Sequence, residues 1–298
     1  MGDASVKCGF AGIIGRPNVG KSTLINALLG HKISITSPMP QTTRHRILGI
    51  RNTAQCQTVF VDTPGINYRE NRAINRYMNR VAHGAIEDVD VVLLVVEAMK
   101  WLVADSAVLE RVAGGNPPVL LVVNKVDQVR PREQLLPYIQ ECASRGTFEE
   151  IVPVSARRGE NLERLNRVLT AKFTEGGPFF PVEMITDRSD RFIAAELIRE
   201  KLIRRLSQEV PYRISVEIEE MTRRRGALHV SAVIWVERPG QKAIVIGRNG
   251  EIMKQTGTFA RRDMQRVFGC GVHLNLWVKV KAGWSDDERC LAELGYVD

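Results

Sequence analysis

Short apolar runs alternate with amphipathic stretches along the first part of the chain. The apolar runs predict buried strands at 9–14, 57–61, 89–96, 119–123 and 151–154. Stretches with helical periodicity predict helices at 21–29, 105–112, 131–143 and 161–172. Strands that alternate with helices are typical of a mainly parallel sheet with helices on both faces. We therefore expect an α/β domain over residues 1–175.

The pattern changes after a Gly- and Pro-rich stretch at 176–181, which suits a linker because both residues stop a helix. We expect the linker to cover 176–190. The remaining elements follow the order α-β-β-α-α-β, with expected boundaries at 191–206, 214–218, 228–236, 258–268 and 273–280. The Ile-rich run 244–246 is expected to be a strand that leads into a Gly-rich turn and a helix. Residues 191–298, which include a C-terminal tail, thus form a separate α+β domain.

Composition narrows the class of protein. The 298 residues are 44% hydrophobic and 26% charged, which excludes a disordered or collagen-like chain. No apolar run is long enough for a transmembrane helix, and the first residues do not predict a secretory signal. The five cysteines are scattered without a C-x-x-C pair, which argues against a zinc site and fits a reducing compartment.

The net charge of +8 is concentrated in one region. Between Arg223 and Arg266 there are ten Lys or Arg and three Asp or Glu, a local excess of +7. This cluster indicates an anionic partner such as a nucleic acid or an acidic membrane surface. On charge alone, a solvated basic surface explains it equally well.

The segment GRPNVGKS follows a predicted strand, opens a predicted helix and fits the pattern G-x-x-x-x-G-K-[ST]. Such a loop points its backbone N–H groups at phosphate oxygens, and the helix N-terminus adds positive potential. Lys21 can reach the β- and γ-phosphates, and the Ser22 hydroxyl suits Mg²⁺. The predicted nucleotide-binding residues here are Gly15, Arg16, Pro17, Asn18, Val19, Gly20, Lys21, Ser22 and Thr23.

Three further motifs follow predicted strands. In Asp62-Thr63-Pro64-Gly65, the aspartate can hold Mg²⁺ through water and the Gly65 N–H can meet a γ-phosphate, although this pattern alone is often a turn. In Asn124-Lys125-Val126-Asp127, the Asp127 carboxylate can accept two hydrogen bonds from guanine, which adenine cannot offer. GTP is therefore favoured over ATP. The pair Ser155-Ala156 is expected to present a backbone N–H to guanine O6.

The ordered set GRPNVGKS, QTTR, DTPG, NKVD and SA resembles the translation-factor-related small GTPases. The resemblance implies that Thr42 or Thr43 closes on Mg²⁺ and the γ-phosphate, and the family pattern favours Thr43. It implies catalytic roles for Lys21, Thr43 and Gly65, and a Mg²⁺ site formed by Ser22, Thr43 and, through water, Asp62.

One position departs from the signalling GTPases, which carry a Gln that orients the attacking water. This chain has Ile66 there, and no other base can be identified from spacing. We expect GTP hydrolysis that is slow without help from a partner, a cation or another loop.

The second domain contains a G-x-x-G turn, a feature that clamps nucleotide backbones in some RNA-binding domains. The turn alone is a weak signal, but the order α-β-β-α-α-β and the basic cluster resemble a type II KH domain. The predicted RNA-binding residues are Ile246, Gly247, Arg248, Asn249, Gly250, Lys254, Arg261 and Arg262. Among the four cations Lys254, Arg261, Arg262 and Arg266, we expect about half to contact phosphate.

Weaker candidates surround this turn. The Arg223-Arg224-Arg225 turn is a further candidate for RNA contact. Trp235, Trp277 and Trp284 are candidates for stacking on bases. Trp235 and Trp277 lie in strand patterns and are expected in the core instead, and His229 and His273 are expected to be packed strand residues.

A GTPase domain followed by a KH domain resembles, over essentially the whole chain, the Era-type family of bacterial ribosome-assembly GTPases. This resemblance implies GTP, GDP and Mg²⁺ as ligands, binding near the 3′ end of 16S rRNA, and a role in assembly of the 30S subunit. It implies a cytoplasmic protein, expected to be a monomer, and permits peripheral association with the inner membrane. GTP binding can affect RNA binding only if GTP orders two segments of the chain. These run from about Lys32 to Arg46 and from Thr63 to about Ala85.

Three alternatives remain open at this point. The first is a constitutive RNA-binding protein with a structural G domain, which the intact Lys21, Ser22, Asp62 and Asp127 disfavour. The second is a membrane-surface regulatory GTPase, whose basic cluster meets anionic lipid. The third is a tRNA-modifying GTPase, for which no cofactor domain or catalytic cysteine motif is found.

Overall fold

The computed structural model describes residues 6–37, 39, 42–64, 72–206 and 209–296. Contacts divide the chain into two compact units, each described by itself. The first unit comprises 1–34, 43–67 and 78–187, and the second comprises 35–42, 68–77 and 188–298, as far as these ranges are described. The second unit therefore includes two segments from the first 80 residues of the sequence.

The first unit is built on one mainly parallel sheet with the strand order β2-β3-β1-β4-β5-β6. Its strands are β1 (Val6–Ile14), β2 (Ile47–Asn52), β3 (Cys56–Asp62), β4 (Val91–Glu97), β5 (Val119–Asn124), β6 (Glu150–Pro153) and β7 (Thr174–Gly176). Strand β2 pairs antiparallel with β3, and β7 pairs antiparallel with β1, whereas the other neighbours are parallel.

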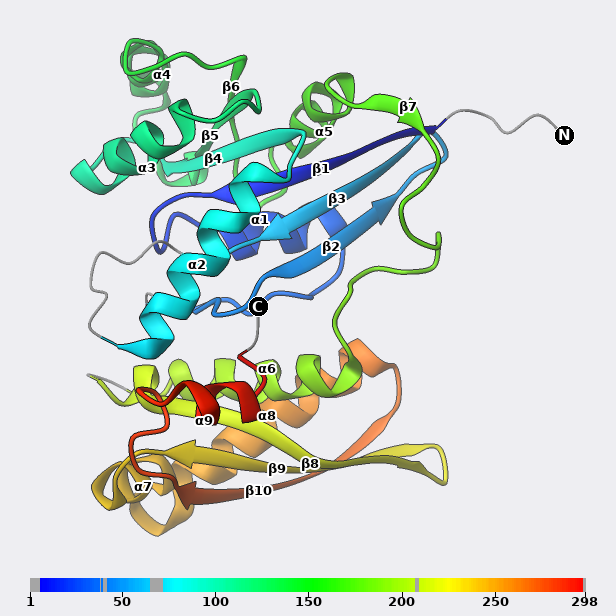
Figure 1. Cartoon of the computed structure of the whole chain (residues 1–298), viewed down its shortest axis with the longest axis vertical. Helices are drawn as coiled ribbons and strands as arrows, with labels where there is room; N and C mark the ends of the chain where they lie inside the picture. The colour runs from blue at the N-terminus through cyan, green and yellow to red at the C-terminus, as the bar shows by residue number, and fades with distance from the viewer. Residues whose placement is uncertain (1–5, 38, 40–41, 65–71, 207–208, 297–298) are drawn as a thin grey trace, which may run out of the picture. The chain divides into compact units, whose positions relative to one another are not determined.

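Helices cover both faces of this sheet (Figure 1). They are α1 (Lys21–Leu29), α2 (Ala73–Glu87, of which residues 73–77 belong to the second unit), α3 (Val103–Ala113), α4 (Leu135–Ala143) and α5 (Leu162–Ala171). Every residue of β5 is buried, which explains its continuous apolar sequence. The mainly parallel sheet with helices on both faces confirms the predicted α/β P-loop GTPase fold. The sequence patterns did not predict β2, β7 or α2.

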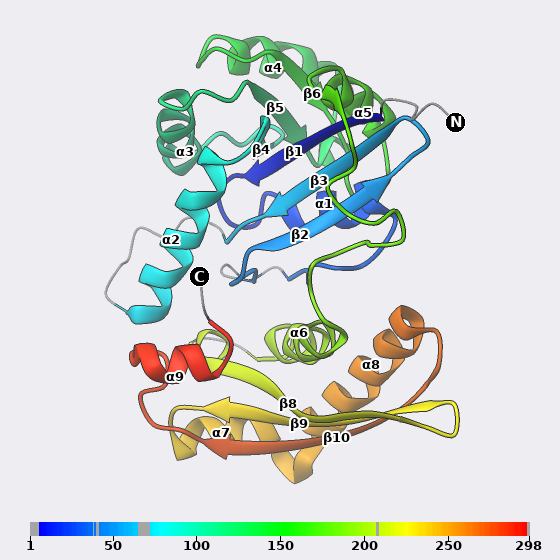
Figure 2. The ribbon, with the colours of Figure 1, turned by 45° about the vertical axis from the view of Figure 1, so that its right-hand side comes forward.

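The second unit is an α+β domain with a three-stranded sheet in the order β10-β9-β8. Its elements are α6 (Asp190–Ile203), β8 (Ile214–Arg224), β9 (Ala227–Val236), α7 (Pro239–Ile246), α8 (Glu251–Phe268), β10 (Gly271–Val280) and α9 (Glu288–Glu293). Short 3₁₀ turns lie at Val126–Gln128 and Arg132–Gln134 in the first unit, and at Val210–Arg213 and Arg248–Gly250 in the second. Helices α6 and α8 pack side by side against the sheet (Figure 2). The order α-β-β-α-α-β is confirmed as that of a KH domain.

The Ile-rich run 244–246 is the end of helix α7, so the prediction of a strand there was wrong. The helix begins at Pro239, a position where the missing backbone N–H of proline costs no helical hydrogen bond. The Gln241 side chain accepts hydrogen bonds from the backbone N–H groups of Glu237 (2.9 Å) and Arg238 (3.1 Å), which caps the helix. Likewise α8 is one continuous helix that begins at Glu251, rather than a second helix that begins near 258.

Within the described residues, no helix is long and apolar enough to cross a membrane.

Candidate nucleotide site and RNA-binding groove

The predicted phosphate loop joins β1 to α1. Gly20 has a φ of +102°, and a Cβ atom there would lie 2.4 Å from Nδ2 of Asn124, so only glycine fits. The Lys21 ammonium is buried and donates hydrogen bonds to the carbonyl oxygens of Gly15 (2.7 Å) and Arg16 (3.0 Å). Burial lowers the pKa of Lys21 to about 8. The Lys21 ammonium therefore lies inside the loop, where phosphate oxygens can take the place of these two carbonyl oxygens.

Three oxygen-bearing side chains converge beside Lys21. The Ser22 Oγ lies 3.1 Å from Thr43 Oγ1 and 3.4 Å from Asp62 Oδ2, and Thr43 Oγ1 lies 3.5 Å from the same carboxylate oxygen. The other oxygen of Asp62 is buried with no hydrogen-bond partner in the described part of the chain. Burial raises the pKa of Asp62, opposed by the nearby charge of Lys21. A hard divalent cation fits this group of oxygens.

The neighbouring threonine is directed elsewhere. The Thr42 hydroxyl donates a 2.7 Å hydrogen bond to the carbonyl of Met39. The geometry therefore places Thr43, and not Thr42, beside the predicted metal ligands. Its role as the switch residue stays a prediction, and Gly65 and Ile66 lie outside the described residues.

The motif predicted to recognise guanine is held in place by its own neighbours. The Asn124 side chain donates to the Val19 carbonyl (2.9 Å) and accepts from the Ala156 N–H (3.0 Å). Asn124 thus joins the phosphate loop to the Ser155-Ala156 loop. The Ser155 hydroxyl donates to Oδ1 of Asp127 at 2.7 Å. Since the Ala156 N–H is engaged by Asn124 here, its contact with guanine O6 also stays a prediction.

Two acidic residues that the sequence analysis missed connect these motifs. Arg16 forms ion pairs with Asp105 (2.9 Å) and Glu97 (3.2 Å), and Glu97 also pairs with Lys125 at 3.0 Å. Although burial acts to raise the pKa of Glu97, its contacts with Lys125 and Arg16 hold it below the ordinary value. Glu97 is the last residue of the apolar strand β4, and a charge at that position is the signal that marks it.

The second unit has a groove of about 310 Å³ between α8 and β10. It is lined by Met253, Lys254, Gly257, Thr258, Arg261, Leu274 and Leu276. A Cβ atom at 257 would make an ordinary van der Waals contact with Leu276, at 3.6 Å. The groove therefore combines an apolar lining with two cationic side chains.

The four candidate phosphate contacts divide into two pairs. Lys254 and Arg261 line the groove, whereas Arg262 and Arg266 are not among its lining residues. The guanidinium of Arg262 lies 5.9 Å from the centre of the Phe259 ring, and Arg266 forms an ion pair with Asp263 at 3.5 Å.

The G-x-x-G turn lies between α7 and α8. Ile246 ends α7, and Arg248 and Asn249 belong to the 3₁₀ turn. Gly247 and Gly250 have φ angles of +75° and +74°, and the Gly250 N–H donates to the Gly247 carbonyl at 3.1 Å. The two glycines thus form a tight turn that directs the chain into α8.

The weaker candidates have mixed outcomes. Trp284 is fully buried, so it is not available to stack on a base. The side chain of Trp277 is 47% exposed rather than in the core, and Trp235 donates to Glu217 at 2.7 Å. His229 and His273 stack on each other on adjacent strands, with ring centres 4.5 Å apart.

Comparison with known proteins bears on both units. Residues 10–125 match the family described as 50S ribosome-binding GTPase, and residues 209–285 match the KH domain family. The chain is 52% identical over 299 residues to the GTPase Era of Glaesserella parasuis serovar 5, with 100% of each chain covered. It is 51% identical to the GTPase Era of Azotobacter vinelandii, over 99% of this chain and 98% of that protein.

A solved structure of Era in complex with MgGDPNP and nucleotides 1506–1542 of 16S ribosomal RNA is 38% identical to this chain. The two superpose with a TM-score of 0.94, over 98% of this chain and 100% of that chain. A solved structure of a single-residue variant of Aquifex aeolicus Era, bound to GDP and AlF₄⁻, has the same identity, TM-score and coverage. With full-length identity above half and both domain families matched in order, the chain belongs to the Era family of GTPases.

Proposed function

We propose that this GTPase is a GTP-dependent switch that binds the 3′ end of 16S rRNA and acts in assembly of the 30S subunit in the cytoplasm. The relative that holds MgGDPNP and nucleotides 1506–1542 of 16S rRNA supports this proposal. The observation that carries it is the groove between α8 and β10. Its apolar lining suits unstacked bases, and Lys254 and Arg261 suit the phosphates that follow them.

The G domain binds the nucleotide and stabilises the negative charge on its phosphates during hydrolysis. Lys21 places its positive charge at the β- and γ-phosphates, and Asp127 accepts from the guanine edge. Mg²⁺, held by Ser22, Thr43 and, through water, Asp62, would offset the negative charge of the phosphates. Since Ile66 cannot orient a water, hydrolysis by the chain alone is expected to be slow.

The proposal is tested by titrating a single-stranded fragment of the 16S rRNA 3′ end against the full chain at one salt concentration. The titration is done with GDP and with a non-hydrolysable GTP analogue. We expect tighter RNA binding with the analogue. Equal affinity in both states would support a constitutive RNA-binding protein instead.

A Gly250→Asp variant tests whether the surface at the G-x-x-G turn binds RNA. It introduces a negative charge at the turn, so we expect RNA binding to fall while GTP binding is retained. If anionic vesicles bind the chain and this variant binds them equally well, while the wild type binds no RNA, the membrane-surface GTPase is the better description.

A further inference from the structure

The described residues of the segment 35–42, which precedes Thr43, belong by their contacts to the second unit. Ile35 is buried in the apolar core that α6 and the KH sheet form. The chain continues from this segment into the first unit at both ends. On one side Ser34 is bound to Asn26 of α1, through hydrogen bonds of 3.0 Å to its N–H and 2.7 Å to its carbonyl. On the other side Thr43 lies beside Ser22.

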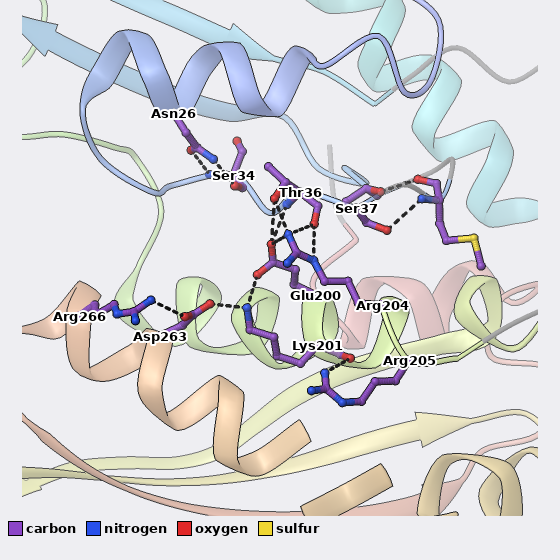
Figure 3. A network of polar contacts seen from close by, with 12 residues as sticks. Asn26, Ser34, Thr36, Ser37, Glu200, Lys201, Arg204, Arg205, Asp263 and Arg266 are labelled. Atoms are coloured by element: carbon purple, nitrogen blue, oxygen red, sulfur yellow. Dashed lines mark hydrogen bonds and ion pairs between the residues drawn. The ribbon is translucent and has the colours of Figure 1, made fainter. Parts of the chain in front are cut away.

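Thr36, in this segment, is held by the side chains of Glu200 in α6 and of Arg204, the residue that directly follows α6 (Figure 3). Its backbone N–H and its hydroxyl each donate to Glu200 Oε1 at 3.1 Å. Its carbonyl accepts from Arg204 Nε (3.0 Å) and Nη2 (2.8 Å), and Nη2 also donates to the Thr36 hydroxyl at 2.8 Å. All three polar groups of Thr36 are thus bound, and we call Glu200 and Arg204 the Thr36 socket.

The socket is joined to the RNA-binding helix α8. Glu200 is fully buried, and its second carboxylate oxygen accepts from Lys201 Nζ at 2.9 Å. Lys201 in turn forms an ion pair with Asp263 of α8 (Figure 3). Asp263 lies two positions after Arg261, which lines the groove. A continuous set of polar contacts therefore runs from Thr36 to the helix that forms one wall of the groove.

We infer that the Thr36 socket couples the nucleotide state to the RNA groove, with Glu200 and Arg204 acting as positioning residues. The inference rests on the proposed function, because it names how the two sites of that function communicate. Thr43, the predicted switch residue, lies beside Ser22 and follows Thr36 by seven positions. A movement of Thr43 is transmitted along the chain to Thr36. If Thr36 shifts, the buried Glu200 carboxylate loses the two hydrogen bonds that Thr36 donates, and it must bind other donors. Lys201 and Asp263 then carry the change to α8.

The test uses the ratio of the RNA dissociation constant with GDP to that with the GTP analogue, measured on the full chain. We expect this coupling ratio to exceed about fivefold in the wild type. Thr36→Val keeps the shape but removes the hydroxyl, and Arg204→Gln removes the guanidinium. Both variants should bring the ratio below about twofold, while each still binds nucleotide and RNA. A merely structural role would lower affinity or stability and leave the ratio unchanged.

Ser37→Ala is the matched control, because the Ser37 hydroxyl accepts from the Met39 N–H within the segment itself. Its ratio should equal that of the wild type. A wild-type ratio in Thr36→Val and Arg204→Gln, or a ratio of one in the wild type, would overturn the inference.

A second measurement does not require RNA. Amide hydrogen exchange of residues 251–268 is compared between GDP and the GTP analogue in the absence of RNA. The wild type and Ser37→Ala should show a nucleotide-dependent difference that Thr36→Val loses. If the wild type shows this difference yet binds no RNA, the proposed RNA function fails and the coupling stands. If it shows none, the coupling fails independently of the RNA result.

Discussion

Ser155 donates a 2.7 Å hydrogen bond from its hydroxyl to Oδ1 of Asp127, the carboxylate that is expected to recognise guanine. The bond fixes the orientation of the carboxylate before a base arrives. Ser155→Ala should therefore weaken GTP and GDP binding about five- to tenfold, which corresponds to roughly 1–1.4 kcal/mol. Affinities measured with a fluorescent guanine nucleotide test this. Ser144→Ala, which removes a hydroxyl that donates to the Glu141 carbonyl, serves as the control. Equal losses in both variants would contradict the role of Ser155.

Glu97 joins Arg16 of the phosphate loop to Lys125 of the guanine motif, and these contacts lower its pKa despite partial burial. A carboxylate whose pKa is lowered in the folded state stabilises the fold at pH values above its ordinary pKa, near 4.5. This contribution disappears as the pH falls through the lower pKa of the folded state. Glu97→Gln should lower the free energy of unfolding by about 1 kcal/mol at pH 7, and the difference from wild type should vanish at low pH.

Denaturant titrations of the two proteins between about pH 3 and pH 7 measure this convergence. Glu110→Gln is the control because Glu110 is exposed on α3. A constant difference between wild type and Glu97→Gln across this range would show that packing, rather than charge, accounts for the loss.

The loops that carry the predicted nucleotide motifs could be located from sequence, because each motif is a contiguous run that follows a strand. The backbone geometry of such a loop is set by nearby residues such as Gly20 and Lys21. Glu97 and Thr36 could not be found in this way, because their roles depend on partners distant in sequence. Thr36 and Glu200 are 164 positions apart.

Local patterns misled where burial depends on packing between distant elements. Trp284 has no apolar run around it, yet it is fully buried, with its ring centre 6.2 Å from that of Tyr296. The run 244–246 is β-branched and apolar, but the Pro239 start and the Gln241 cap upstream make it helical. The strand propensity of these three residues was therefore outweighed by the capping of helix α7.

The two glycines of the G-x-x-G turn should tolerate substitution differently. A Cβ atom at 247 would lie 2.7 Å from Cγ1 of Ile252, whereas a Cβ at 250 would meet nothing within 4 Å. Gly247→Ala should therefore destabilise the second unit by about 2–3 kcal/mol, and Gly250→Ala by about 1 kcal/mol from backbone strain alone. Midpoints of chemical denaturation, followed by fluorescence, measure both losses. Equal midpoints for the two variants would contradict the crowding at Gly247.

Arg261 and Arg262 are adjacent on α8, but only Arg261 lines the groove. The guanidinium of Arg262 lies over the Phe259 ring instead. If the groove binds RNA, Arg261 is the side chain that neutralises a phosphate and releases its counterion. Arg261→Gln should therefore weaken binding of the 16S rRNA fragment about tenfold at low salt. It should also reduce the slope of log affinity against log salt concentration by about 0.7, the value for one phosphate contact on a single strand.

Arg262→Gln is the matched variant, since it removes the same charge from the next position of the same helix. It should change the affinity less than about threefold and leave the salt slope within about 0.2 of wild type, because a distant charge acts only through the screened field. Both variants are measured between about 50 and 200 mM salt with the GTP analogue bound. If the two slopes fall equally, the effect comes from the overall charge of α8, and RNA binding does not depend on the groove. A loss confined to Arg261→Gln instead assigns the phosphate contact to the groove wall, where Lys254 is the next residue to substitute.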